Sequence, residues 1–263
     1  MSLSIVVDSF TERAFAGNPA AVCILEAEQD VPWMQNVARE MNLPATAFVS
    51  PARDGFALRW FSPKSELDLC GHGTLAAAHV LWQDGYLPRE GDACFLTRSG
   101  RLVAQREGDW IWIDFAADPV QRMQADEALL RALSVAPTYV GKSRLDYLVE
   151  VETPADVERF APDFALLRTV PTRGVIVTSR ASDGRYDFVS RFFAPRFGID
   201  EDSVTGSAHC CLGPFWGHRL GKTDLIARQL SARSGEIRVR LRGDRVHVGG
   251  RAITVMRGQL VDG

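Results

Sequence analysis

Apolar and β-branched residues occur in short runs, separated by Gly and Pro, along most of the chain. Such runs predict strands, because alternate side chains of a strand point to opposite faces of a sheet. Stretches with helical spacing of apolar residues are fewer, and they cover residues 31–42, 72–85, 125–134, 154–160 and 206–220. These elements do not follow a regular strand–helix–strand repeat. The pattern therefore predicts an α+β fold with antiparallel sheets.

One pattern occurs twice in the chain. Residues 59–63 read Arg-Trp-Phe-Ser-Pro and residues 191–195 read Arg-Phe-Phe-Ala-Pro, 132 positions apart in a chain of 263. After each Pro, the chain passes through an acidic stretch into a predicted helix that opens with small residues. The duplication predicts two similar lobes, each with a strand, a loop and a central helix. We expect residues 1–116 to form the first lobe and residues 117–263 the second, with the last strand free to return to the first.

Glycines and hydroxyl residues stand where the two central helices are predicted to begin. They are Gly71, Gly73 and Thr74 in the first half and Thr205, Gly206 and Ser207 in the second. The first N–H groups of a helix have no intrahelical partner, the helix dipole favours negative charge there, and glycine lets a ligand approach the backbone. Each hydroxyl taken alone is more typical of a helix cap. The paired occurrence favours binding of a small carboxylate in a cleft between the lobes.

Three side chains near these helix starts are candidates for proton transfer. Cys70 precedes Gly-His at the first start, where a thiolate is favoured, although a cysteine in such a place is more often a small buried hydrophobic residue. His72 could donate a hydrogen bond or a proton, although a lone histidine is more often structural. Asp202 lies 132 positions after Cys70, and we regard the two as candidate partners.

Composition and motifs argue against several other classes of protein. A formal net charge of -3 and a pI near 6.0 give no basic surplus for nucleic acid or anionic membranes. No stretch approaches the roughly 18 to 20 apolar residues that span a bilayer, and the start does not resemble a signal peptide, so we expect a cytoplasmic protein. The five cysteines and five histidines show neither CxxC nor HExxH spacing, which argues against a metal site. Sequences of the GxSxG, GxGxxG and Walker A types are also missing.

Several segments together resemble the PhzF-like family, named for the isomerase of phenazine biosynthesis. They are VDSFTERAFAGNPAAVC at 7–23, MNLPATAFV at 41–49, RWFSPKSELDLCGHGTLAAAHVL at 59–81, GIDEDSVTGSAHCCLGPFW at 198–216, and VHVGGRAITVMRGQL near the end. The resemblance implies the diaminopimelate epimerase fold, with two pseudo-symmetric lobes, each a curved, mostly antiparallel sheet around a central helix. It also implies a homodimeric isomerase without metal or organic cofactor. Asn18 lies in the first segment and is a candidate substrate-binding residue, although Asn is also common in turns.

One position departs from the family pattern. The phenazine enzyme isomerises a dihydro-3-hydroxyanthranilate, and the resemblance places its proton-carrying glutamate in a segment Asn-Leu-Ser-Glu-Thr. Residues 42–46 here read Asn-Leu-Pro-Ala-Thr, so Ala45 occupies the position of that glutamate, whereas His72, Asp202 and Ser207 match the family. A positioned general base contributes about 100- to 10,000-fold in rate. We therefore do not expect the phenazine reaction by its usual route.

Three interpretations of Ala45 remain open. In the first, Cys70 replaces the glutamate, most naturally in an epimerisation that pairs it with Asp202. Related epimerases and proline racemases use a cysteine in a similar CGH run, but their Cys-Gly-Thr-Gly turn is not found in the second half of this chain. In the second, the protein binds a small acid without converting it. In the third, the alanine was introduced to trap a complex. Our prediction is an isomerase of a small carboxylate, cyclic or derived from an amino acid.

Overall fold

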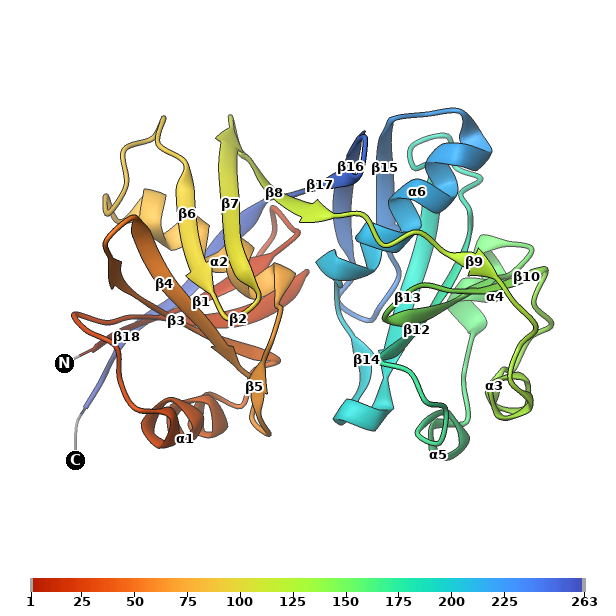
Figure 1. Ribbon diagram of the computed structural model, residues 1–263, viewed down its shortest axis with the longest axis horizontal. Helices are drawn as coiled ribbons and strands as arrows, with labels where there is room; N and C mark the ends of the chain where they lie inside the picture. Colours follow the sequence, from red (N-terminus) through yellow and green to blue (C-terminus); the bar gives the residue numbers. More distant parts are fainter. Residues whose placement is uncertain (1, 262–263) are drawn as a thin grey trace. The chain divides into compact units, whose positions relative to one another are not determined.

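The computed structural model describes residues 2–261 and divides the chain into two units, drawn in Figure 1. Unit 1 contains the chain up to Phe115 and again from His247 onward, and unit 2 contains Ala116–Val246. The last strand thus belongs to the unit that the first residues form. Each unit combines strands with few helices, which confirms the predicted α+β class.

Unit 1 is a mostly antiparallel sheet around a central helix. Its strands are β1 (Ser2–Ser9), β2 (Asn18–Ile24), β3 (Ala45–Ala52), β4 (Gly55–Phe61), β5 (Glu66–Leu67), β6 (Ala93–Thr97), β7 (Gly100–Glu107), β8 (Trp110–Ala116) and β18 (Ala252–Leu260), with β17 (Arg245–Gly250) at the unit boundary. Strand β1 lies between β2 and β18 and is antiparallel to both. Strand β3 pairs in parallel with β2 and antiparallel with β4.

The central helix of unit 1 is α2 (Gly71–Gln83), and α1 (Val31–Met41) is the other. Nearly every residue of α2 is buried, including the three alanines 76–78, and the helix contacts β1, β2, β3 and β18. A helix that is apolar all round requires burial on all sides, and small side chains allow strands to approach it closely. By contrast, α1 is amphipathic and begins at Asp30, whose side chain accepts from the N–H of Trp33.

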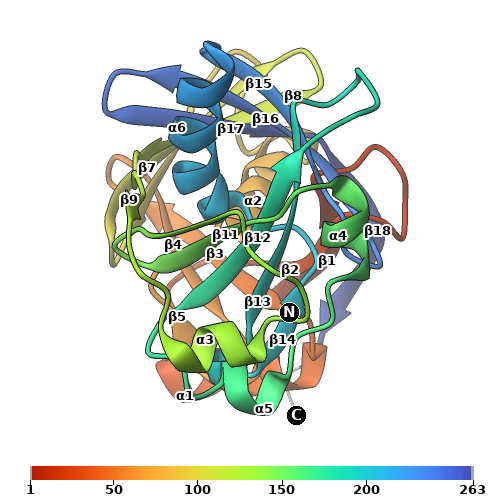
Figure 2. The same cartoon turned by 90° about the vertical axis from the view of Figure 1, so that its right-hand side faces the viewer.

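Unit 2 has the same kind of architecture. Its strands are β9 (Gln121–Arg122), β10 (Tyr139–Lys142), β11 (Asp146–Glu150), β12 (Gly174–Arg180), β13 (Phe188–Ala194), β14 (Ile199–Asp202), β15 (Asp224–Gln229) and β16 (Gly235–Arg242). Its helices are α3 (Glu127–Ala132), α4 (Pro154–Arg159), α5 (Phe164–Leu167) and α6 (His209–Leu220), with 3-10 turns η1 (Pro195–Phe197) and η2 (Gly206–Ala208). Strands β12 and β13 run antiparallel and side by side in the middle of this sheet (Figure 2). Of these helices, only the single turn α5 was not predicted, because four residues are too few to show a period.

Helix α6 continues through Pro214 without a break. Proline has no N–H, so the carbonyl of Cys210, one turn earlier, loses its helical donor. The backbone N–H of Asp118 donates to that carbonyl at 3.0 Å instead. Gly213 and Gly217 bring the same helix close to β16, since a Cβ atom on either would lie within 3 Å of a side chain of that strand.

The duplicated sequence forms the same structure in each unit. Arg59 on β4 donates two hydrogen bonds to the carboxylate of Glu66 on β5, at 2.8 and 3.0 Å. Arg191 on β13 donates two to the carboxylate of Glu201 on β14, at 2.6 and 2.8 Å. In both units the chain passes from this short hairpin into the central helix. The predicted duplication is confirmed, and in each unit the glutamate of the hairpin is bound to the arginine.

Candidate functional site

The start of α2 brings Cys70 and His72 into contact. Cys70 is the residue before the helix, with extended backbone angles, and both side chains are buried. The Cys70 sulfur lies 3.5 Å from Nδ1 and 3.8 Å from Nε2 of the His72 ring. Because the two distances are nearly equal, the sulfur is not in line with either N–H bond of the ring. A thiolate in this position is next to a ring that can carry positive charge and a helix N-terminus that favours negative charge.

Three neighbouring residues hold this helix start in place. The backbone N–H and the hydroxyl of Thr74 both donate to the Cys70 carbonyl, at 2.9 and 2.7 Å. The hydroxyl of Ser9, at the end of β1, donates to the His72 carbonyl at 2.9 Å. A Cβ atom on Gly73 would lie 2.8 Å from the Trp60 ring and 3.0 Å from the Cys70 sulfur, which leaves room only for glycine.

Ala45 and Asn18 both begin strands in unit 1, and both are buried. The parallel pairing of β2 and β3 places Ala45 opposite Ala20, two positions from Asn18. Asn18 is in turn paired with Ser9, the residue that bonds to the helix start. The methyl group of Ala45 brings no titratable group to this part of the unit.

The start of the second central helix contains a buried network around Asp202. The hydroxyl of Thr205 donates to Asp202 Oδ2 at 2.6 Å. The side-chain amide of Gln229, at the end of β15, accepts from the Thr205 N–H at 2.8 Å and donates to the Asp202 carbonyl at 2.8 Å. Gln229 is fully buried and closes the turn from residue 202 to residue 205. Sequence reasoning missed it, because it is far along the chain and belongs to no motif.

Ser207 in η2 is bound to an arginine that sequence reasoning also missed. Arg173 Nη1 donates to the Ser207 hydroxyl oxygen at 3.0 Å. The same guanidinium donates through Nε at 2.9 Å and through Nη2 to the two oxygens of Asp146, which is buried. Burial lowers the pKa of Arg173, but hydrogen bonds and the charge of Asp146 outweigh it and hold the pKa above its ordinary value. The side chain is therefore a permanent cation.

The residues after Ser207 have structural roles. His209 Nδ1 lies 2.9 Å from the Thr205 carbonyl, so this nitrogen carries the hydrogen, and Nε2 has no partner among residues 2–261. Burial lowers the pKa of His209 to about 4, which keeps the ring neutral. Burial also raises the pKa of the Cys210 thiol to about 12 and that of Cys211 well above its ordinary value. These thiols are unsuited to act as bases near neutral pH.

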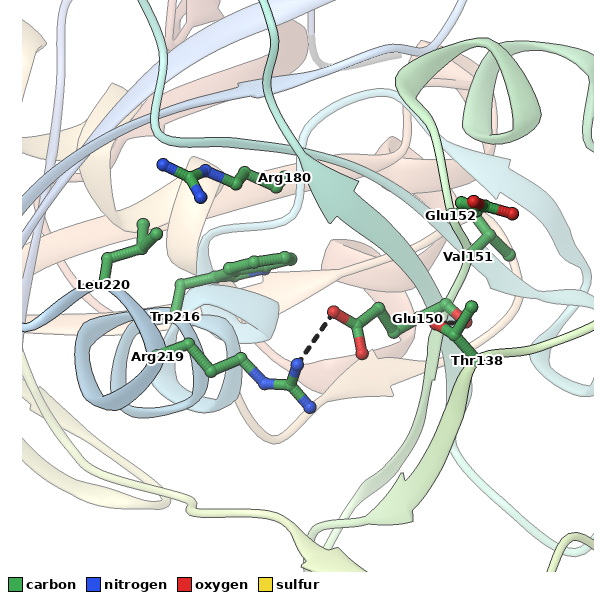
Figure 3. A pocket seen from close by; sticks show the side chains of 8 residues that line it. All are labelled: Thr138, Glu150, Val151, Glu152, Arg180, Trp216, Arg219 and Leu220. Carbon is green, nitrogen blue, oxygen red and sulfur yellow. Dashed lines mark hydrogen bonds and ion pairs between the residues drawn. The ribbon is translucent and has the colours of Figure 1, made fainter.

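A hollow of about 440 Å³ lies at the other end of α6 (Figure 3). Its lining residues are Thr138, Glu150, Val151, Glu152, Arg180, Trp216, Arg219 and Leu220. Arg219 Nη1 donates to Glu150 at 2.9 Å, so these two charges neutralise each other. Twelve residues of helix, about 18 Å, separate the two ends of α6. None of the predicted site residues lines this hollow.

Two negative findings apply to the described part of the chain. Residues 2–261 contain no group of three or more His, Cys, Asp or Glu side chains arranged to hold a metal ion. No helix in the same range is both long enough and apolar enough to cross a bilayer. Side chains capable of acid–base chemistry lie at both helix starts, Cys70 and His72 at the start of α2 and Asp202 shortly before η2.

Known proteins share this fold and much of this sequence. The family model described as phenazine biosynthesis-like protein matches residues 7–258. An uncharacterized isomerase from Halalkalibacterium halodurans is 48% identical over 257 residues, which cover 97% of each chain. The crystal structure of a PhzF family protein from Enterococcus faecalis superposes with a TM-score of 0.94 at 38% identity, over 99% of this chain and 100% of the other. A probable proline racemase from Agrobacterium radiobacter has the same fold, with a TM-score of 0.69 at 13% identity over 99% of this chain and 93% of the other.

Proposed function

This chain belongs to the phenazine biosynthesis-like family, and we propose that it is an isomerase that moves a proton on a small carboxylate, cyclic or derived from an amino acid. Relatives of nearly full length are named isomerases, among them those from Halalkalibacterium halodurans and Pseudomonas aeruginosa. The observation that carries the proposal is the buried contact between the Cys70 sulfur and the His72 ring at the start of α2. It supplies a candidate base in a family member that has alanine at position 45.

We assign the two proton-carrying roles to Cys70 and Asp202. As a thiolate, Cys70 takes the proton from the carbon next to the substrate carboxylate, and the electron pair of that C–H bond stays on the carbon. Asp202 delivers a proton to the carbanion and is left as the carboxylate. The Thr205 hydroxyl and the Gln229 amide hold Asp202 and its turn in one orientation. The N–H groups at the start of α2, which have no partner within the helix, are suited to bind the carboxylate.

The first test measures exchange of carbon-bound protons with solvent. The protein is incubated with amino and hydroxy acids and with dihydro-3-hydroxyanthranilate in deuterated water, and deuterium incorporation is followed by mass spectrometry. We expect exchange by the parent protein and a loss of about 100- to 10,000-fold in Cys70→Ala and in Asp202→Asn. Cys94→Ala is the matched control, because Cys94 lies on β6, apart from the helix start. Exchange that survives both site variants would refute the two assignments.

A second candidate function follows from Ala45. Its buried methyl group replaces the family's proton carrier, so a protein that binds a small acid without converting it also fits the site. In that case the acid raises the melting temperature while no deuterium is incorporated. Exchange that appears only in an Ala45→Glu variant would favour this binding function over the isomerase.

A further inference from the structure

We infer that Arg173 is a positioning residue of this site, which directs the Ser207 hydroxyl to donate its hydrogen to a bound carboxylate. The inference rests on the proposed function and deepens it. Arg173 Nη1 donates to the Ser207 oxygen at 3.0 Å. Within residues 2–261 that is the one side-chain hydrogen bond of Ser207.

The chemistry of the two groups fixes the direction of the hydroxyl. A serine hydroxyl has one hydrogen to donate and two lone pairs to accept with, whereas a guanidinium only donates. Arg173 therefore occupies a lone pair of Ser207 and leaves its hydrogen for another acceptor. A neighbouring cation also polarises the O–H bond and makes it a stronger donor. Ser207 lies in η2, two residues before the first residue of α6, near a helix start whose dipole also favours an anion.

The sheet holds Arg173 rigidly. The parallel pairing of β11 and β12 places Asp146 opposite Gly174, the residue after Arg173. The two hydrogen bonds from the guanidinium to the Asp146 carboxylate therefore connect neighbouring strands. The backbone N–H of Arg173 also donates to the Leu145 carbonyl at 3.1 Å. The guanidinium carbon lies 5.5 Å from the centre of the Phe192 ring. A guanidinium held in this way directs a hydrogen bond accurately, because it loses little freedom when the ligand binds.

The ion pair also decides which feature of the ligand is recognised. The charge of Arg173 is balanced by the buried Asp146 carboxylate, so the pair carries no net charge. We therefore expect the site to select a carboxylate by the hydrogen bond from Ser207 and by the helix N–H groups. A free cation would attract any anion.

Ligand binding tests the inference without requiring turnover. Benzoate and L-proline are used as cyclic carboxylate probes, with benzamide as a neutral control, and binding is measured by isothermal titration calorimetry. Ser207→Ala and Arg173→Met are each expected to weaken carboxylate binding about tenfold, the equivalent of one hydrogen bond to a charged group. Because Arg173 acts through Ser207, the double variant is expected to bind no more weakly than Ser207→Ala alone.

Two further variants separate positioning from folding. Arg173→Lys keeps the charge but cannot fork onto Asp146 and reach Ser207 at once, so it is expected to lose affinity while its melting temperature stays near that of the parent. Arg173→Met with Asp146→Leu removes the pair without leaving a buried charge, and it is expected to bind as Ser207→Ala does. Where the parent exchanges deuterium, Ser207→Ala is expected to raise KM with little change in kcat.

Three results would overturn the inference. They are additive losses in the double variant, unchanged carboxylate affinity in Ser207→Ala, and a parent protein that binds neither benzoate nor L-proline. Failure of the isomerase proposal is distinguishable, because the protein would then incorporate no deuterium while these affinities still changed as described.

Discussion

Replacing Arg191 with methionine is expected to destabilise unit 2 by about 3 kcal/mol. Its guanidinium donates two hydrogen bonds to Glu201 and packs over the Phe193 ring. Its Nη1 atom also donates to carbonyls at the end of α4, those of Val157, Glu158 and Phe160. Methionine keeps an apolar stem and loses every one of these bonds. Breaking a buried ion pair costs about 3 to 5 kcal/mol, and we take the lower end because Glu201 is partly exposed.

The same change at Arg59, in unit 1, is expected to destabilise its unit by only about 1 to 2 kcal/mol. Arg59 forms the equivalent fork onto Glu66 and packs over Phe61. Glu66, however, keeps a second partner, because Arg98 Nη1 lies 2.7 Å from its carboxylate. The other acid bound by Arg59 is Glu28, whose side chain is 60% exposed, and such a pair contributes little. Because the two arginines occupy equivalent positions, the difference in stability cost reports the partners that remain after each substitution.

Urea denaturation followed by circular dichroism measures both effects, and hydrogen exchange assigns them to units, since two units need not unfold in one step. Arg185→Met is the control, because its side chain is 69% exposed and its pair with Glu236 should contribute under about 1 kcal/mol. A cost for Arg59→Met equal to or above that for Arg191→Met would refute this reasoning. So would a cost below about 1 kcal/mol for Arg191→Met.

Two further predictions concern buried groups near the helix starts. The free energy of unfolding should fall as pH decreases from about 6.5 to about 4. In this range His209 binds a proton in the unfolded chain, whereas the buried ring of the folded protein stays neutral. Urea titrations at several pH values measure this dependence, and the His209→Gln variant should lose up to about 3 kcal/mol of it. A residual slope should remain from His79, because burial also lowers its pKa to about 4. Gly73→Ala should lower the free energy of unfolding by about 1 to 3 kcal/mol and reduce deuterium exchange, since the added Cβ would displace Cys70 or Trp60. Gly258→Ala has open space, so an equal loss there would contradict this account.

Much of the fold was predictable because its determinants are local. The helical spacing of apolar residues predicted the central helices, and the repeated Arg-aromatic-Phe pattern predicted the duplication. The helix starts were predictable for the same reason, since glycine and hydroxyl residues mark them in the sequence. The predicted helix over residues 206–220 includes Pro214, but the donor that replaces the missing N–H could not be predicted, because it belongs to Asp118, far away in the chain.

The groups that surround the candidate site were not predictable in this way. Arg173 is separated from Asp146 by 27 positions and from Ser207 by 34. The register of β11 and β12 brings Arg173 next to Asp146, and Ser207 comes from η2, on neither strand. Gln229 reaches Asp202 through a similar non-local path. Contacts of this kind depend on strand pairing, which no short motif encodes.

Hydroxyl residues illustrate a different limit. The hydrogens of Thr74 and Thr205, both predicted to bind substrate, are donated to the Cys70 carbonyl and to the Asp202 carboxylate. A threonine that closes a helix start and one that binds a ligand there have the same sequence context. Their direct contact with substrate stays a prediction.

The position of β18 has a consequence for the order in which the chain acquires structure during synthesis. Strand β1 needs β2 on one edge and β18 on the other, and β18 is made only after the whole of Ala116–Val246. During synthesis one edge of β1 therefore stays uncovered until β18 is made, whereas Ala116–Val246 is a continuous stretch that is complete earlier. Unit 2 thus has the opportunity to fold first although it is second in the sequence. Loss of β18 would leave β1 with an open edge, and open strand edges promote aggregation.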